Sequence, residues 1–212
     1  MCARFSLGIH KGMERFIMIP VDGERYRRFN VAPTTHIPVA VMNGEVHADD
    51  QIWGILPPWS KQRLINARVE NLLVKSFFKG LMQKNRCLIP ATGFFEWREE
   101  NGRKQPYHFR LRDSEPFFFA GLWRQGEAGR ECVIVTTEPN EVVAPFHDRM
   151  PAMMRPSDLS VWLEGSPEEA WSRVTPIEPE RLEVFAVTPR VNSPRYEDED
   201  CVEPIEVQGE LF

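Results

Sequence analysis

Short apolar segments separated by proline or glycine dominate this chain, which contains 18 prolines and 13 glycines. β-branched and aromatic side chains fill these segments, and such side chains favour extended strands. Proline and glycine at the segment ends are typical of turns. The pattern predicts a mostly antiparallel protein with strands at residues 37–42, 51–56, 87–97, 106–111, 117–123, 132–137 and 182–187.

Helical periodicity is strongest at residues 69–83, where apolar side chains recur at spacings near three and four. Two shorter helices are predicted at residues 158–163 and 167–174. The second begins at a capping box, because Glu169 follows Ser166 by three positions. Strands grouped with a few helices, without strict alternation, predict an α+β fold. We expect a single domain with a curved, barrel-like, mostly antiparallel sheet core and a few flanking helices.

Acidic residues are concentrated at the end of this 212-residue chain, whose net charge is −5. Residues 197–212 contain seven acidic residues and no lysine or arginine, so 26 basic and 24 acidic residues remain in residues 1–196. That body can carry a local basic groove, although it is not a strongly basic nucleic-acid binder. We therefore predict one domain at 1–196 and an acidic C-terminal tail at 197–212, most simply a solvated terminus.

The four cysteines are far apart and form no Cys-x-x-Cys pair. This spacing favours neither a zinc ribbon nor a dense disulfide framework, and we expect neither a metal nor a cofactor. No basic segment followed by an apolar run marks the start of the chain, and no apolar run is long enough to span a bilayer. We expect a soluble, cytoplasmic monomer with no membrane partner. The cysteines are Cys2, Cys87, Cys132 and Cys201.

Cys2 directly follows Met1, so removal of the methionine would leave an amine and a thiol on one residue. An aldehyde or ketone condenses with such an amine to an imine, and the thiol then closes a five-membered thiazolidine. An α-amine has a pKa of about 7.7 to 8.0, against about 10.4 for lysine, so far more of it is neutral at pH 7. The alternative is that a small residue at position 2 merely permits methionine removal.

Glu96 and His147 are the other titratable candidates for chemistry. Glu96 lies between aromatic residues in a predicted strand, and partial desolvation would raise its pKa and suit it to acid and base work. The alternative is a strand residue that faces water. His147 lies in a short loop between prolines, where a histidine can transfer protons near neutral pH or can simply be a surface residue.

Together these segments resemble the SOS response-associated peptidase (SRAP) domain family, whose members covalently capture abasic sites in single-stranded DNA. The resemblance spans nearly the whole chain and rests on several ordered motifs. These are Cys2 to Phe5, Tyr26 to Pro33, Trp53-Gly54 with Pro58-Trp59, Ile65 to Glu70, Gly93 to Trp97, Val135-Thr136, His147 to Pro151 and Val191 to Pro194.

The resemblance implies that residues 1–196 form a catalytic and single-stranded DNA-binding domain, which associates with the nucleoid when bound to DNA. Cys2, freed of Met1, would form a thiazolidine with the ring-opened sugar of an abasic site. Asn66 would hold the Cys2 terminus or the sugar, Glu96 would act as acid and base, and His147 would promote ring opening. The implied DNA contacts are Arg4, Arg68 and Arg149 to phosphates, Pro33 and Trp59 to bases, and Thr136 in support.

Two departures and two other functions accompany this interpretation. The family pattern has glycine where this chain has Ala3, and a second bulky residue where it has Ser60, so the crosslinking rate is expected to differ. One alternative function is a thiol peptidase, including self-cleavage, with Cys2 as nucleophile and His147 as base. The other is a noncovalent single-stranded DNA-binding module that uses tryptophans and arginines alone.

Overall fold

A closed ring of strands forms the larger part of the fold in the computed structural model, which describes residues 2–8, 27–100 and 102–206. The pairing of β9 with β10 closes the ring. Neighbouring strands are antiparallel except β4 and β10, which run parallel. The predicted barrel-like core is confirmed. In ring order its strands are β10 (Arg130–Thr137), β4 (Glu45–Trp53), β3 (His36–Asn43), β6 (Arg86–Ala91) and β9 (Phe117–Gln125).

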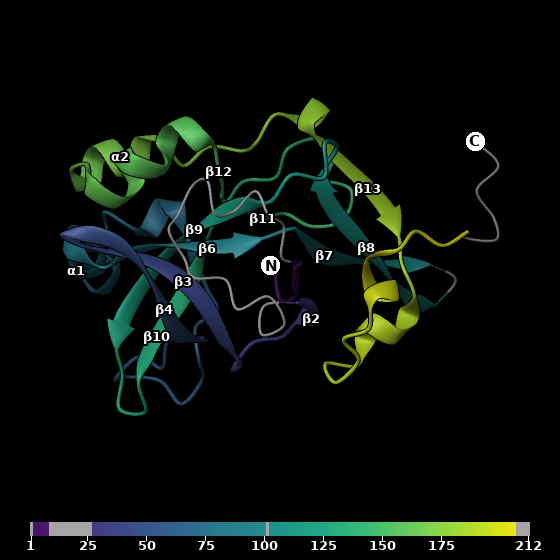
Figure 1. The fold of residues 1–212 in the computed structure, drawn as a ribbon, viewed down its shortest axis with the longest axis horizontal. Coiled ribbons are helices and arrows are strands. Elements are labelled where there is room, and N and C mark those ends of the chain that lie inside the picture. Colours follow the sequence, from purple (N-terminus) through teal and green to yellow (C-terminus); the bar gives the residue numbers. More distant parts are fainter. Residues whose placement is uncertain (1, 9–26, 101, 207–212) are drawn as a thin grey trace.

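A second, five-stranded antiparallel sheet lies beside the barrel (Figure 1). The start of the chain forms its short strand β1, which pairs with β7 and β2 and lies near the centre of the view. This position matters for function, because it places Cys2 inside the molecule. The strand order is β13 (Leu182–Ala186), β8 (Arg103–Leu111), β7 (Gly93–Glu100), β1 (Phe5–Leu7) and β2 (Arg28–Val31).

The single strand predicted at residues 87–97 is two strands, one in each sheet. β6 ends at Ala91 in the barrel, and β7 begins at Gly93 in the five-stranded sheet. Gly93 is packed so closely that a Cβ there would lie 2.6 Å from the Phe109 carbonyl oxygen. The chain passes from one sheet to the other where only glycine fits.

The core joins the two sheets through aromatic side chains. Phe5 of β1 contacts Trp53 of β4 edge to face, with ring centroids 5.1 Å apart, and contacts Phe119 of β9 in the same manner. Phe94 and Phe109 stack at 4.8 Å between β7 and β8. Fully burying one such side chain contributes roughly 1.5 to 3 kcal/mol. β1 is therefore anchored in the core although it has only three residues.

The helix predicted at residues 69–83 is shorter than its periodicity indicates. A 3-10 turn, Val69–Asn71, comes first, and helix α1 spans only Ser76–Lys84. Lys75 between them has an extended backbone with ψ of 124°, which interrupts the helical path. Leu72 belongs to this interruption and is still fully buried, so packing against the barrel decides the conformation more than helix periodicity does.

The later helices agree with their predictions. Helix α2 spans Leu159–Glu164 after a 3-10 turn at Pro156–Asp158, and α3 spans Pro167–Ser172. The capping box is confirmed, because the Ser166 hydroxyl accepts from the Glu169 amide and the Glu169 carboxylate accepts from the Ser166 amide. In the described part of the chain, no helix is long and apolar enough to cross a membrane.

Five short strands were not predicted from the sequence. β1, β2, β5 (Asn66–Arg68), β11 (Met150–Pro151) and β12 (Met153–Met154) contain two to four residues each. Segments of that length show too little alternation to be recognised as strands. β5 is the most consequential, because it lies parallel to β10 and carries Asn66 and Arg68.

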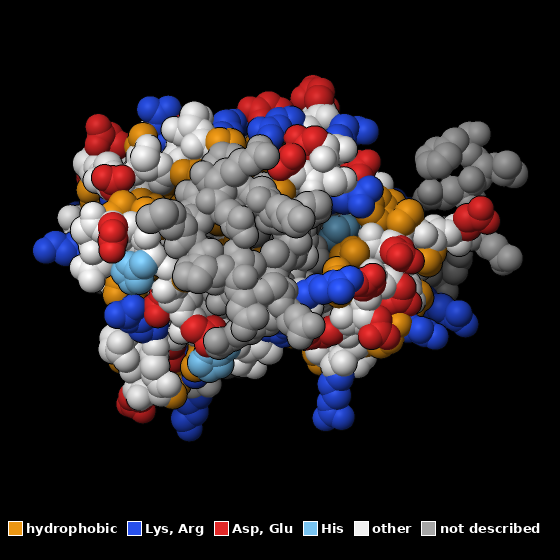
Figure 2. Space-filling model, viewed as in Figure 1, with side chains coloured by type: hydrophobic (Ala, Val, Ile, Leu, Met, Phe, Trp, Pro, Cys, Tyr) orange, Lys and Arg blue, Asp and Glu red, His pale blue; other side chains and the backbone are white. Residues whose placement is uncertain are grey.

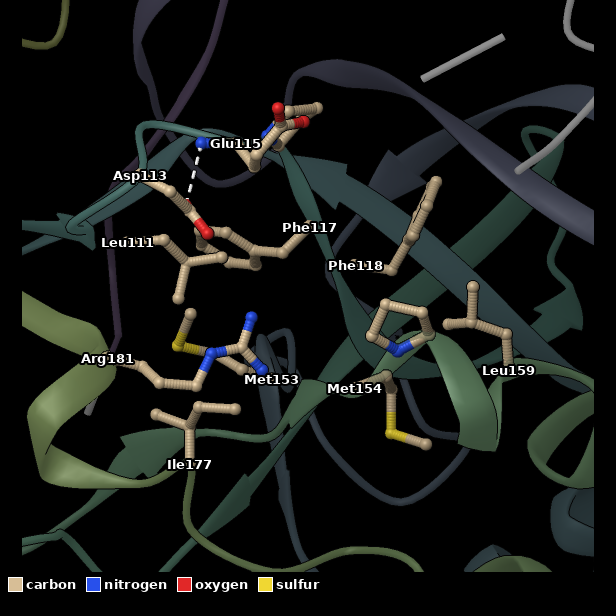
Figure 3. Close-up of a pocket in the computed structure, with 12 residues that line it drawn as sticks. Leu111, Asp113, Glu115, Phe117, Phe118, Met153, Met154, Leu159, Ile177 and Arg181 are labelled. Carbon is tan, nitrogen blue, oxygen red and sulfur yellow. Dashed lines mark hydrogen bonds between the residues drawn. The ribbon is translucent and has the colours of Figure 1, made fainter. Parts of the chain in front are cut away.

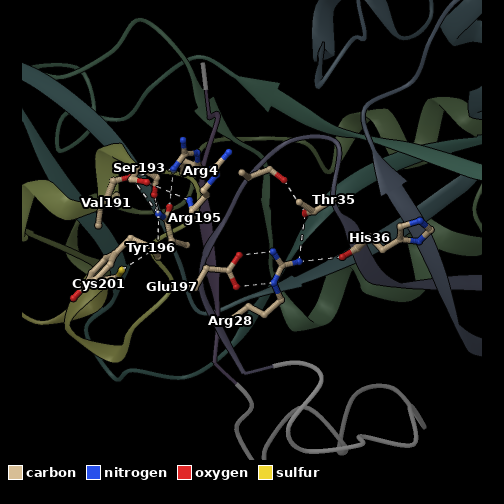
Figure 4. A network of polar contacts seen from close by, with 12 residues as sticks. Arg4, Arg28, Thr35, His36, Val191, Ser193, Arg195, Tyr196, Glu197 and Cys201 are labelled. Atoms are coloured by element: carbon tan, nitrogen blue, oxygen red, sulfur yellow. Dashed lines mark hydrogen bonds and ion pairs between the residues drawn. The ribbon is translucent and has the colours of Figure 1, made fainter.

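The end of the chain packs against the body instead of extending into solvent up to residue 206. Asn30 of β2 donates through Nδ2 to three carbonyl oxygens of the segment 191–196, and Arg28 forms a two-pronged ion pair with Glu197 (Figure 4). Cys201, in the 3-10 turn Glu199–Val202, is buried against Phe95. The solvated-terminus interpretation is therefore corrected for residues 197–206, while 207–212 lie outside the described residues.

Two further 3-10 turns complete the described chain, at Pro179–Arg181 before β13 and at Pro189–Asn192 after it. Acidic side chains gather over the C-terminal segment on the right of Figure 2. The charge excess of the chain end is thus displayed on the surface although its backbone is folded onto the body. The predicted domain boundary at residue 196 stays a prediction.

Candidate functional site

Cys2 lies fully buried just before β1, the strand that pairs with β2 and β7 in the five-stranded sheet. Its thiol donates to the carbonyl oxygen of Arg4 at 3.5 Å. Burial raises the pKa of the Cys2 thiol far above its usual range, and the negative charge of Glu96 raises it further. The thiol is therefore protonated at neutral pH, and it lies within electrostatic reach of the predicted acid and base. Met1, whose removal is predicted, lies outside the described residues.

Asn66 connects Cys2 to the barrel. Its side-chain Nδ2 donates to the Cys2 carbonyl oxygen at 2.9 Å, across 64 positions in the sequence. The short strand β5 holds Asn66 in register with Ile134 of β10. The Asn66 Oδ1 atom is buried and, within the described residues, accepts no hydrogen bond. Asn66 thus fixes the backbone of Cys2 against the barrel.

Glu96 is a buried carboxyl group on β7, with 4% of the residue exposed. Burial raises its pKa to about 7, and the nearby Asp148 carboxylate acts in the same direction. A carboxyl group that titrates near pH 7 can accept and return protons under physiological conditions. The desolvated interpretation of Glu96 therefore holds, and the alternative of a water-facing strand residue is wrong.

His147 lies in the loop before β11, and its ring is about one quarter exposed. Burial lowers the pKa of His147, so the ring is neutral near pH 7. Its Nδ1 accepts the backbone N–H of Arg149 at 3.0 Å, which helps to fix the orientation of the ring. The Asp148 carboxylate, 2.8 Å from Nδ1, would stabilise the protonated ring once a proton is taken up. The ring can therefore act as a base.

Arg149 forms a buried clamp. Its guanidinium makes two hydrogen bonds to Glu70, at 2.6 and 2.9 Å, and a third to the Thr136 carbonyl oxygen at 2.8 Å. Only 7% of Arg149 is exposed. The clamp joins the segment after β5 to the loop that carries His147. Glu70 was not among the predicted site residues, although it stands in the motif that carries Asn66.

An open groove of about 610 Å³ leads away from Asn66. Arg68 and Trp59 line it, together with Lys75 and Phe77 from the start of α1. Trp59 is 66% exposed and meets Phe77 edge to face, with centroids 4.9 Å apart. The groove combines cations with an exposed aromatic face, the combination that binds single-stranded nucleic acids. Phe77 and Lys75 had no sequence signal beyond helix periodicity.

The remaining predicted DNA contacts lie in three places. Arg4 donates to Asn30 and to the Val191 carbonyl oxygen, so the C-terminal segment engages it (Figure 4). Pro33 lies half-buried in the turn that joins β2 to β3. Thr136 is fully buried on β10, beside Arg68 in the strand pairing. Among the predicted DNA contacts, the structure brings Arg68 and Trp59 together with Asn66 in one groove.

Two other features lie away from this groove. Trp53 is fully buried against Phe5, so the noncovalent alternative cannot use it as a stacking platform. A separate apolar cavity of about 300 Å³, with Arg181 beside Met153 and Ile177, contains none of the predicted site residues (Figure 3). In the part of the chain that is described, no group of three or more His, Cys, Asp or Glu side chains could hold a metal ion.

Comparisons with known proteins agree on one family. The model of the family described as SOS response associated peptidase (SRAP) matches residues 1–194. The abasic site processing protein YoqW of Bacillus subtilis is 32% identical over 223 residues, which cover 96% of this chain and 99% of that protein. The abasic site processing protein YedK of Escherichia coli is 35% identical over 151 residues, covering 68% of each chain.

A solved structure shares the fold. The crystal structure of a protein from Bacteroides thetaiotaomicron superposes with a TM-score of 0.78 at 24% sequence identity, covering 97% of this chain and 99% of that chain. At this identity the likeness speaks for the architecture alone. It agrees with the barrel and adjoining sheet described above.

Proposed function

The chain belongs to the SOS response associated peptidase (SRAP) family, and from this premise we propose that it processes abasic sites in single-stranded DNA. Cys2, once Met1 is removed, forms a covalent thiazolidine with the open-chain sugar and so shields the site during the DNA damage response. One observation carries the proposal: the Asn66 amide holds the Cys2 carbonyl, beside a carboxyl group whose pKa is about 7.

The reaction needs two bond-forming steps. The neutral α-amine of Cys2 adds to the sugar aldehyde, and loss of one water gives the imine. The Cys2 sulfur then adds to the imine carbon, while its proton passes to the nitrogen. Because burial keeps the thiol protonated, this second step requires a group that takes the proton and returns it, and Glu96 with its pKa of about 7 suits that task.

His147 and the groove complete the proposed site. A neutral His147 removes the hydroxyl proton when the sugar ring opens, and Asp148 stabilises the ring that results. Arg68 and Arg149 are proposed phosphate contacts, the latter by exchanging its Glu70 partner for a phosphate. Trp59 offers its exposed face to a base, which favours unpaired strands because their bases expose their own faces. Arg4, Pro33 and Thr136 remain proposed supporting contacts.

The thiol peptidase alternative has less support. The Cys2 thiol donates to the Arg4 carbonyl oxygen, whereas the peptidase alternative requires it to donate to His147 as the base. Self-release of Cys2 from Met1 and lyase-type chemistry at the abasic site belong to the proposal as secondary activities. We propose a cytoplasmic monomer that associates with the nucleoid when DNA is bound.

Denaturing gel electrophoresis tests the proposal. We expect the protein to form a heat-stable adduct with a single-stranded oligonucleotide that contains one abasic site. The matched control is the same oligonucleotide with the base intact, which should give no adduct. If the abasic oligonucleotide binds under native conditions but leaves no adduct after denaturation, the protein is a noncovalent binding module.

A further inference from the structure

The loop at residues 54–65, between β4 and β5, carries Trp59 and is held at both ends. A pair of backbone hydrogen bonds joins its ends, from Ile55 N to Leu64 O at 2.9 Å and from Leu64 N to Ile55 O at 2.7 Å. Between these ends Trp59 extends outward with 66% of its surface exposed. Because most of the Trp59 side chain is exposed, its own packing contributes little to its position. The base of the loop must therefore hold it in place.

Glu131 of β10 supplies that placement. Its Oε1 accepts from Arg63 Nη1 at 2.7 Å, and its Oε2 accepts from the backbone N–H of Leu56 at 3.1 Å. One carboxylate therefore ties the residue that precedes the Trp59 turn to the residue that follows it. Arg63 Nη1 also donates to the Gly54 carbonyl oxygen at 2.6 Å, so both strands of the loop meet at a single guanidinium and carboxylate.

The carboxylate is built into the barrel edge. Glu131 is only 3% exposed, although charged side chains are rarely buried without a purpose. A Cβ at Gly126 would lie 2.5 Å from the Glu131 Cδ, so the glycine leaves the space that the carboxylate fills. At Gly54, where φ is +126°, the backbone takes the left-handed path that brings its carbonyl to Arg63. Removing the Arg63 charge would leave the buried Glu131 carboxylate without its ion-pair partner, and removing the Glu131 charge would leave the partly buried Arg63 guanidinium without this partner.

We propose that Glu131, through Arg63, is a positioning residue that sets the Trp59 wall of the groove and thereby the affinity for single-stranded DNA. Trp59 meets Phe77 at 89°, which makes a corner of two rings between the loop and helix α1. A base can stack on Trp59 only while the loop keeps that corner closed. Glu131 does not touch Cys2, Glu96 or His147 in any described contact, so the covalent step is independent of it. The inference rests on the proposed DNA-binding role of the groove.

Fluorescence anisotropy with a labelled single-stranded oligonucleotide that has all its bases measures the affinity of the groove for DNA. Without an abasic site, no covalent adduct can form during the measurement. Trp59→Ala should weaken binding roughly 5- to 100-fold, which is the loss of affinity expected when one base no longer stacks on an aromatic ring. Glu131→Gln should weaken it about 3- to 10-fold, since the loop then samples other positions. In the Trp59→Ala protein, the added Glu131→Gln substitution should change the affinity by less than about twofold, because the two act through one contact.

Two controls separate positioning from general damage. Glu183→Gln removes a more exposed ion pair, to Arg110 in the five-stranded sheet, and should leave the affinity unchanged. Arg63→Gln breaks the same clamp from the loop side, so it should weaken binding as much as Glu131→Gln does. It also provides the test if the Glu131→Gln protein folds poorly. With the abasic oligonucleotide at saturation, the rate of adduct formation should equal that of the unmodified protein.

Independent effects of Trp59→Ala and Glu131→Gln, or unchanged affinity in both clamp variants, would overturn the inference. So would a reduced rate at saturating DNA. Failure of the proposed function has a different signature. In that case no adduct forms in the unmodified protein, while the affinity for intact single-stranded DNA still falls in the clamp variants.

Discussion

Cys2→Ser should lower the yield of heat-stable adduct by about two orders of magnitude, because a hydroxyl is a much weaker nucleophile toward the imine than sulfur. The amine remains, so the imine itself can still form. Borohydride should therefore trap a reduced adduct with Cys2→Ser, whereas the unmodified protein needs no reductant. The measurement is a denaturing gel after heating, with and without borohydride.

The matched control for this substitution is Cys201→Ser, which alters a buried thiol that donates to the Tyr196 carbonyl oxygen in the C-terminal segment. Its adduct yield should equal that of the unmodified protein. Mass spectrometry must first show that Met1 is removed from both variants. A heat-stable adduct formed equally well by Cys2→Ser, without reductant, would exclude the thiazolidine.

Glu96→Gln should slow adduct formation roughly 100-fold or more at pH 7, the usual worth of a positioned acid and base. Because burial raises the pKa of Glu96 to about 7, the unmodified protein should speed up as the pH rises through 7 and the carboxylate forms. The rate of the Glu96→Gln variant should not increase near pH 7 and should follow only the titration of the terminal amine. Single-turnover rates between pH 5.5 and 9 would show the difference, and Glu99→Gln, an exposed neighbour on β7, is the control.

The same pKa shift predicts an opposite effect on stability. The folded-state pKa of Glu96, about 7, lies above the usual glutamate value of 4.5, so the folded protein holds this proton more tightly than the unfolded chain. Stability from the neutral carboxyl is complete below about pH 4.5 and is lost as the pH rises to about 7. At pH 8 the Glu96→Gln protein should therefore have a higher Tm than the unmodified protein. A lower Tm at pH 8, with an unchanged pH–rate profile, would contradict a desolvated carboxyl at this position.

Local patterns predicted those elements that neighbouring residues determine. The strand at Phe117–Gln125 and the capping box of Ser166 and Glu169 were both readable, because alternation and capping depend on neighbouring residues. The change from one sheet to the other at Gly93 could not be predicted from the local sequence, since it depends on the close approach of Gly93 to Phe109. Closure of the barrel by β9 and β10 likewise depends on pairing that no local pattern contains.

The central residues of the candidate site could be predicted from the sequence, whereas the contacts between them could not. Family motifs indicated Asn66, Glu96 and His147, and the fold places Asn66 and Glu96 around Cys2. Their connections were hidden, because they join residues far apart in the sequence. The Arg149 clamp to Glu70 spans 79 positions, and the Arg63 clamp to Glu131 spans 68. Arg149 itself, predicted as a phosphate contact, is buried in a salt bridge that the sequence could not reveal.

The mass of the purified adduct after denaturation and alkylation tests the central claim most directly. The chain has four cysteines, all with free thiols in the structure. A thiazolidine consumes the Cys2 thiol and releases one water, so the adduct should weigh the Met1-free protein plus the oligonucleotide less one water, and should accept three alkyl groups. An adduct that accepts four alkyl groups, or that retains Met1, would show that the DNA is not held by the aminothiol of Cys2.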